Sequence, residues 1–305
     1  MNYRFLQNVS VSEICFGTAT FARGKLFPNK NSEEGTNTLL QALNEGINII
    51  HSNPNLETQW AIKESISQSK KKPVHIIKIE APLIQDEKII EAIFENRINQ
   101  SLNSLQTDEL FGILYEPDHK ITPKSDLENT TTLNYNFHTI DKIFLKLEKK
   151  YKINFIGLMA KTEIELNTAI ENEHFKVVSS YFNLYNTWPA KYFDKLKSKK
   201  LDFIAIQPLK YGILTDGFAS TKKPFDKYAS LIYYSSENAF KNIFAWQKNN
   251  YSEPLQTTAL KFALAHESVK TVIIGISSAN HLIENLNIEP LNKLDFYNII
   301  NTELK

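Results

Sequence analysis

The feature that most constrains this 305-residue chain is a repeated alternation of short apolar runs with longer segments of helical period. Eight apolar runs fit buried strands, and each is followed by at least one segment of helical spacing. The runs are continuously apolar, as is typical of parallel strands that helices cover on the outside. Eight such units in a chain of this length predict a (β/α)8 TIM barrel, with a single domain over residues 1–305.

The predicted strands and helices succeed one another along the whole chain. The predicted strands are Ile14–Gly17, Ile47–Ile50, Val74–Ile79, Leu110–Leu114, Asn154–Leu158, Val177–Val178, Leu201–Ile206 and Thr271–Ile274. The predicted helices are Ser32–Gly46, Thr58–Gln68, Ile89–Leu105, Ile140–Lys150, Glu163–Ile170, Ala190–Lys199 and Glu253–His266. Long connections over Glu116–Thr132 and Leu209–Ser236 follow the fourth and seventh strands, at the strand ends where barrels build active sites. A doubly wound sheet is the rival, but the sequence lacks the G-x-G-x-x-G turn that such a sheet uses to bind dinucleotides.

Composition excludes several classes of function. Lys and Arg number 35 against 34 Asp and Glu, so no strong field favours binding to nucleic acid or to a membrane. No apolar stretch approaches the roughly 20 residues of a membrane helix, and the N-terminus lacks the apolar core of a signal peptide. Cys15 is the only cysteine, and the histidines show no H-x-H or H-x-x-x-H spacing. We therefore predict a cytoplasmic protein without disulfides and without a metal site.

Five segments, in order along the chain, together resemble the aldo-keto reductase family. Residues 3–18 resemble its opening hairpin and first strand, and GINII at 46–50 resembles the entry to its second strand. Further matches are SLNSLQTD at 101–108, QPLKYGIL at 207–214, and the C-terminal cofactor segment at 274–286. This resemblance covers nearly the whole chain. It implies a barrel that transfers a hydride between a nicotinamide and a carbonyl.

The resemblance also implies four catalytic positions: a proton-donating tyrosine, a lysine paired with an aspartate, and a histidine that orients the carbonyl. Only the lysine is present, as Lys78 at the end of the third strand. His51 stands at the aspartate position, Leu56 at the tyrosine position and Tyr115 at the histidine position. Three of the four groups are therefore replaced.

These replacements allow two interpretations of Lys78. In the first, the site is rebuilt: Lys78 lowers the pKa of Tyr115, which donates the proton, and His51 relays the proton or positions the substrate. In the second, Lys78 pairs with Glu116 or Glu80 and takes no part in catalysis.

The same resemblance implies a binding site for NADP or NAD. On the nicotinamide side, Met159-Ala160 replaces serine–asparagine, Ser179 replaces a glutamine and Ile206 replaces the stacking aromatic residue. The cofactor positions that it implies are Ser179, Gln207, Leu209, Gly212, Leu214, Gly275, Ser277, Glu284 and Asn285. Ser277 lies where the family has a basic residue near the 2′-phosphate, so the choice between NADP and NAD stays open.

Two functions follow. The first is an NAD(P)(H)-dependent oxidoreductase that acts on a small carbonyl or sugar-type substrate with atypical catalytic residues. The alternative is a catalytically inactive barrel that serves as a binding or regulatory subunit and takes a protein partner. Loss of a general acid costs about 10²–10⁴-fold in rate, and misplaced reacting atoms cost more. Either the acid has moved, the reaction has changed, or there is no reaction.

Overall fold

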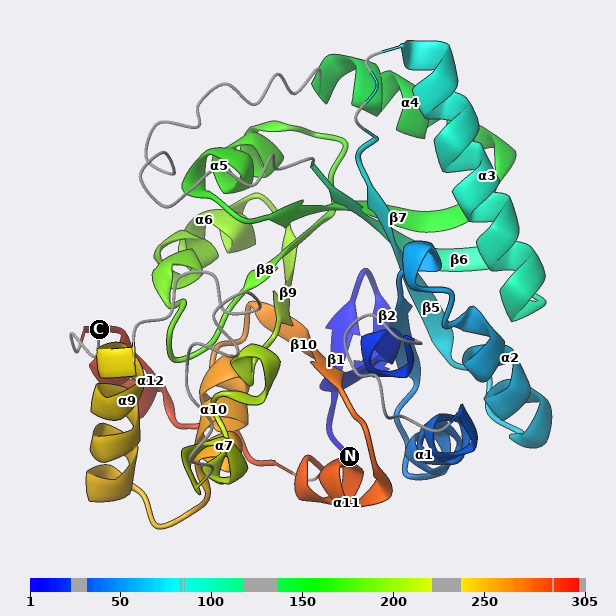
Figure 1. Ribbon diagram of the computed structural model, residues 1–305. Helices are drawn as coiled ribbons and strands as arrows, with labels where there is room; N and C mark the ends of the chain where they lie inside the picture. Colours follow the sequence, from blue (N-terminus) through cyan, green and yellow to red (C-terminus); the bar gives the residue numbers. More distant parts are fainter. Residues whose placement is uncertain are drawn as a thin grey trace.

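A closed barrel of eight parallel strands, in the order β10-β3-β4-β5-β6-β7-β8-β9, forms the centre of the molecule, and helices cover it from the outside (Figure 1). This confirms the predicted TIM barrel. The computed structural model describes residues 1–22, 32–82, 84, 86–117, 137–220, 237–286 and 288–301. Among those residues, no helix has the length and apolar character needed to span a bilayer.

The elements have the following bounds. The barrel strands are β3 (Ile14–Gly17), β4 (Ile49–Ser52), β5 (Val74–Glu80), β6 (Glu109–Glu116), β7 (Lys152–Ala160), β8 (Val177–Tyr181), β9 (Asp202–Ile206) and β10 (Val269–Gly275), and β1 (Tyr3–Leu6) and β2 (Val9–Ser12) form a separate hairpin. The helices are α1 (Ser32–Asn44), α2 (Gln59–Gln68), α3 (Glu87–Leu105), α4 (Phe137–Lys150), α5 (Glu163–Glu171), α6 (Phe193–Ser198), α7 (Asp216–Ser220), α9 (Glu237–Asn250), α10 (Leu255–Leu264), α11 (Ala279–Glu284) and α12 (Lys293–Asn301). Short 3-10 turns include η2 (Pro54–Leu56), η4 (Trp188–Tyr192) and η5 (Lys210–Gly212).

Each predicted strand lies within or overlaps an observed one, and several observed strands continue past the apolar run. β5 runs on to Glu80 and β6 to Glu116, so both strands end in charged residues. The predicted helix Ala190–Lys199 is instead the turn η4 followed by α6. Most of the two long predicted connections lies outside the described residues.

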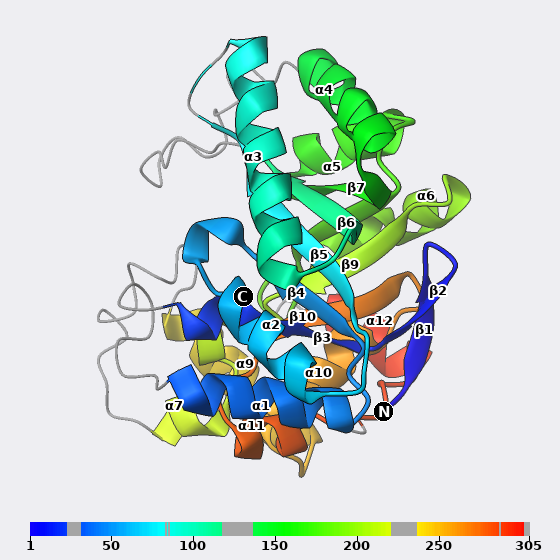
Figure 2. The same ribbon diagram turned by 90° about the vertical axis from the view of Figure 1, so that its right-hand side faces the viewer.

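The β1–β2 hairpin covers the end of the barrel at which the strands begin (Figure 2). Arg4 of this hairpin donates to Glu13 at 2.6 Å. Its guanidinium also donates to the main-chain oxygens of Leu264, His266 and Val269, at 2.7, 3.0 and 2.7 Å. Because Val269 is the first residue of β10, these bonds hold the hairpin across the N-terminal strand ends. The opposite end of the barrel, where the strands finish, is the mouth.

Apolar side chains fill the barrel interior below the mouth. The interior cluster includes Cys15, Ile49, Ile76, Leu114, Phe155, Met159, Val177, Ile204, Ile206 and Ile273. Phe155 on β7 pairs with Gly112 on β6, and a β-carbon at Gly112 would lie 2.1 Å from the Phe155 ring. The absent side chain of Gly112 therefore makes room for the phenylalanine. A second, larger apolar layer separates the strands from the helices.

Candidate active site

Strand alternation aims a set of polar side chains into the mouth of the barrel. Ile49, Ile76, Leu114 and Met159 all belong to the interior cluster. Side chains two residues further along a strand point the same way, because the side-chain period of a strand is two. The inward polar residues at the strand ends are therefore His51 on β4, Lys78 and Glu80 on β5, Glu116 on β6, and Lys161 directly after β7.

Glu116 bridges two lysines at the mouth. Its Oε2 forms an ion pair with Lys78 Nζ, and its Oε1 forms one with Lys161 Nζ. Lys78 Nζ also lies 2.9 Å from Glu80 Oε1. The side chain of Glu116 is 10% exposed, that of Lys78 is 18% exposed and that of Lys161 is 26% exposed. The four charges thus form one connected network, in which Glu116 and Lys78 are the most buried members and Glu80 is the most exposed.

The turn η2, which follows β4, fixes Glu80. Asn53 Nδ2 donates to Glu80 Oε1 at 2.8 Å, and Asn55 Nδ2 donates to Oε2 at 2.7 Å. Pro54 sits at the start of this turn, where its fixed φ suits the first helical position. Leu56, in place of the expected tyrosine, belongs to the same turn. This segment therefore contributes amide donors to the ion network instead of a phenol.

The network sets the charges of its members at neutral pH. Burial disfavours the charge on Lys78, but Glu116 and Glu80 outweigh it and raise the pKa of Lys78. Burial likewise disfavours the charge on Glu116, and the two lysines outweigh it and lower the pKa of Glu116. For His51 the balance is the reverse: burial first, and then the charge of Lys78, outweigh the effect of Glu116 and lower the pKa of His51 to about 3. The site therefore holds a lysine cation beside a neutral imidazole.

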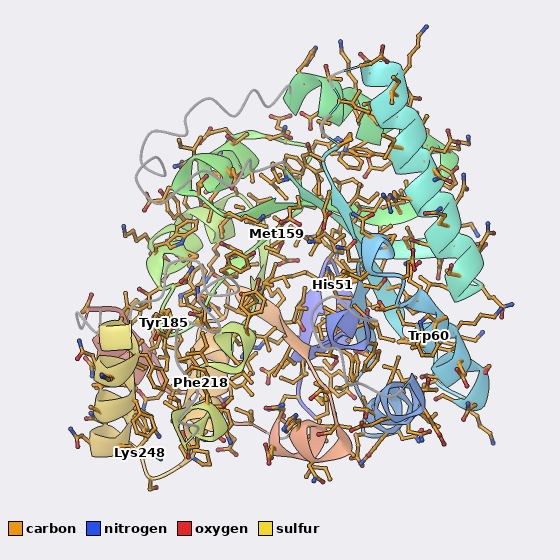
Figure 3. All side chains as sticks on the ribbon, in the orientation of Figure 1. His51, Trp60, Met159, Tyr185, Phe218 and Lys248 are labelled. Carbon is orange, nitrogen blue, oxygen red and sulfur yellow. The ribbon has the colours of Figure 1, made fainter. Side chains whose placement is uncertain are left out.

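Two buried polar atoms in the barrel interior have no hydrogen-bond partner among the described residues: His51 Nε2 and Ser179 Oγ. His51 and Met159 lie within the ring of strands in Figure 3. Ser179 on β8 pairs with Met159 on β7 and points inward, two residues after Val177 of the interior cluster. A buried polar atom without a partner costs free energy, so each of these atoms suits a ligand group.

Tyr115 lies on the other face of its strand. It packs in the outer apolar layer, with its ring centroid 5.8 Å from that of Phe94 on α3 and 5.7 Å from that of Phe144 on α4. The structure therefore does not bring Tyr115 together with Lys78 and His51, because Glu116 is the residue at the end of β6 that points inward. Lys78 instead forms ion pairs with both Glu116 and Glu80, the two partners that the second interpretation names.

This placement yields a prediction for Tyr115. Replacing Tyr115 by Phe should change the turnover of any detected substrate by less than about twofold, because the hydroxyl lies outside the mouth. Steady-state kinetics of the wild type and the variant would measure this. If the variant keeps the near-ultraviolet circular dichroism spectrum of the wild type but loses about a hundredfold in turnover, Tyr115 takes part in catalysis.

The turn after β9 carries four of the cofactor positions implied by the resemblance: Gln207, Leu209, Gly212 and Leu214. Gln207 and Gly212 have φ of 53° and 86°. Asn183 Nδ2 donates to the Gln207 carbonyl at 2.8 Å and so ties this turn to the segment after β8. Within the turn, Lys210 is buried, with Nζ 6.0 Å from the centroid of the Tyr185 ring. The turn thus holds a cation near the mouth.

The remaining implied positions follow β10. Gly275 ends that strand, and Ser277 Oγ lies 3.0 Å from His281 Nδ1 of α11. Asn285 Nδ2 donates to the His281 carbonyl at 2.6 Å, so this amide caps the helix. Glu284 is exposed at the end of α11.

A groove of about 460 Å³ lies between α1 and α11. It is lined by Glu33, Glu34, Asn37, Thr38, Gln41, Ser278, Ala279 and Asn280. None of these described lining residues is a lysine or an arginine, so the charges on the groove wall are the two carboxylates.

The residues present fit a nicotinamide dinucleotide in three places. Ser179 offers a buried, unpartnered hydroxyl for a carboxamide. Lys210 offers a cation for a diphosphate. The groove between α1 and α11 has the size of a small-molecule site for the adenosine end.

Sequence reasoning named Glu80 only as a possible partner of Lys78, and it missed Lys161, Asn53 and Asn55 as members of the site. The available signal was the strand period: Glu80 lies two residues after Lys78, and Lys161 lies two after the inward Met159. The two asparagines carry no such signal, because their contact with Glu80 depends on how the turn η2 folds over β5.

Comparison with known proteins agrees with this fold. A sequence model of the family described as "Aldo/keto reductase family" matches residues 13–301 of this chain. An aldo-keto reductase from Bacillus halodurans, in its holo form, is 16% identical, with a TM-score of 0.75 over 98% of this chain and 95% of that one. The glycerol dehydrogenase of Gluconobacter oxydans is 16% identical, with a TM-score of 0.71 over 96% and 91%. A thermostable aldo-keto reductase in complex with the inhibitor epalrestat is 15% identical, with a TM-score of 0.72 over 100% of both chains. A search of curated proteins found no match.

Proposed function

This chain belongs to the aldo/keto reductase family, and we propose that it is an NAD(P)(H)-dependent oxidoreductase that acts on small carbonyl or sugar-type substrates with Lys78 in place of the family's tyrosine. The observation that carries this proposal is the charged Lys78 at the barrel mouth, held between Glu116 and Glu80 beside a neutral His51. Neither Tyr115 nor Leu56 can supply the proton, since one faces outward and the other is aliphatic.

When bound, a nicotinamide would supply or accept the hydride in this function, and the chain's own residues act on the substrate oxygen. His51 Nε2, in the tautomer that carries a proton there, donates to the carbonyl oxygen and orients it. The Lys78 ammonium stabilises the negative charge that develops on that oxygen and gives it a proton, because an alkoxide is far more basic than an amine. Glu116 and Glu80 keep Lys78 protonated between turnovers.

Ser179, Lys210 and the groove between α1 and α11 would hold the cofactor at its carboxamide, diphosphate and adenosine ends. The groove carries Glu33 and Glu34. A 2′-phosphate placed near these carboxylates would be repelled. We therefore propose NAD(H) as the preferred cofactor.

A titration of the protein with each reduced cofactor tests this proposal. NADH should bind with micromolar affinity, which corresponds to about −8 kcal/mol, and NADPH should bind more weakly. Lys210→Gln should weaken NADH binding by about tenfold, through loss of a charge-assisted contact. Lys199→Gln, at an exposed position after α6, serves as the control and should bind as the wild type does. Calorimetry or quenching of protein fluorescence would measure both.

The result that would overturn the proposal is the absence of NADH and NADPH binding up to millimolar concentration. Such a protein would perform no hydride transfer, and the binding or regulatory alternative would take its place. If either cofactor binds, aldehydes, ketones and keto-sugars should be screened for turnover by nicotinamide absorbance.

A further inference from the structure

We propose that Lys161 forms a subsite for an anionic group of the substrate, so that this site prefers carbonyl compounds carrying a carboxylate or a phosphate close to the carbonyl carbon. This inference rests on the proposed function for the carbonyl chemistry. The anion subsite itself is a property of Lys161 and can be tested without turnover.

Lys161 is the more exposed of the two lysines in the ion network. Its side chain is 26% exposed, against 18% for Lys78, so it meets water and any entering ligand first. Among the described residues, Glu116 is the one carboxylate with which its ammonium forms an ion pair. An ammonium group has three N–H donors, so this contact leaves donors for a ligand oxygen.

The backbone at Lys161 is rigidly held. Glu165 Oε2 accepts from the Lys161 amide at 2.6 Å and from the Thr162 amide at 3.0 Å. The Thr162 hydroxyl accepts in turn from the Glu165 amide and completes a capping box at the start of α5. The lysine is thus presented from a fixed point at the end of β7, which lowers the entropic cost of binding a ligand.

The position of Lys161 relative to Lys78 sets the distance between the carbonyl and the anion. Both ammonium groups contact the same carboxylate, one on each oxygen of Glu116, so they lie within a few ångströms of each other. A substrate whose carbonyl oxygen contacts Lys78 therefore places a group only one or two atoms away beside Lys161. A 2-oxo acid, whose carboxylate adjoins the carbonyl, has this arrangement.

The positions of Glu80 and Lys161 set the orientation of an anionic substrate at the mouth. The side chain of Glu80 is 39% exposed and lies on β5, whereas Lys161 follows β7, on the far side of β6 in the strand order. An anionic substrate is repelled by the first and attracted by the second, so its charged end faces β7. The Lys161–Glu116 pair lies at the mouth, where an entering ligand can reach the lysine.

The test uses oxalate and inorganic phosphate as probes, with binding measured by calorimetry on the full chain. At least one of them should bind the wild type with millimolar affinity or better, and Lys161→Gln should bind it at least about tenfold more weakly. Lys161→Arg keeps the charge and should retain binding. Lys152→Gln is the matched control: Lys152 is exposed at the opposite end of β7, paired with Asp108, and should bind as the wild type does. Tighter binding of oxalate assigns a carboxylate substrate, and tighter binding of phosphate assigns a phosphorylated one.

Kinetics separate this inference from the proposed function. Glyoxylate and glycolaldehyde differ in whether a carboxylate adjoins the aldehyde, and Lys161→Gln should raise the KM for glyoxylate at least tenfold more than that for glycolaldehyde. If a probe binds to the wild type but not to Lys161→Gln, and no carbonyl compound is turned over, the result supports the subsite and overturns the reductase function. Failure of both probes to bind the wild type, or equal binding by Lys161→Gln, would overturn the subsite even if neutral aldehydes are reduced.

Discussion

Replacing Lys78 by Met is expected to lower kcat/KM for carbonyl reduction by about 10²–10⁴-fold, the range for loss of a general acid. The variant removes both the proton and the positive charge that face the substrate oxygen. It leaves Glu116 paired with Lys161, and Glu80 bonded to Asn53 and Asn55, so the mouth keeps its other contacts. Lys152→Met, far from the mouth, is the control. Steady-state kinetics with the best substrate and cofactor would measure the loss.

The pH dependence distinguishes a proton donor from a structural ion pair. Lys78 donates only while protonated, and its raised pKa should keep the wild type active up to pH values above the ordinary lysine range. Glu116→Gln removes the main cause of that rise, so its activity should fall at a lower pH than that of the wild type. If Lys78→Met stays within tenfold of the wild type, Lys78 is not the donor and its ion pairs are structural.

Truncating Phe155 to Ala should cost about 3–5 kcal/mol in the free energy of unfolding, because the ring fills the barrel interior and is fully buried. Gly112→Ala should cost about 1–3 kcal/mol by itself, since the new methyl group would overlap the Phe155 ring. Urea denaturation of the single and double variants would measure the coupling between the two sites.

The double variant is the decisive member of this set. With the ring absent, the methyl group at position 112 enters the cavity instead of overlapping an atom, so the double variant should be more stable than the sum of the single losses predicts. Strict additivity of the two losses would show that the strands move apart on their own and that Gly112 does not make room for Phe155.

The strand cores and the first helix could be predicted from the sequence because each depends on local signals. The apolar run Ile14–Gly17 is the strand β3, and α1 ends before Gly46, whose φ of 100° suits the glycine that stops a helix. α9 was missed, although Phe240, Ile243 and Gln247 recur at helical spacing on its buried face.

The site was harder to predict because it depends on register between strands. Placing Tyr115 at the mouth is an error of one residue, and in a strand one residue exchanges the inside for the outside. The residue of β6 that does point inward is Glu116, an anion that pairs with the lysine cations at the mouth. No spacing along the chain indicates that one carboxylate on β6 will join Lys78 on β5 to Lys161 after β7, because those contacts arise only when the barrel closes.

The N-terminal hairpin has a consequence for how the chain folds. Arg4 is separated by 260 to 265 residues from its acceptors at Leu264, His266 and Val269. The N-terminal end of the barrel therefore closes only after both segments have been synthesised, and β10, which joins β3 to β9, belongs to the later of the two. Strands between the two segments can pair with their neighbours as they emerge, but closure of the ring and of its N-terminal end both wait for the segment that carries β10.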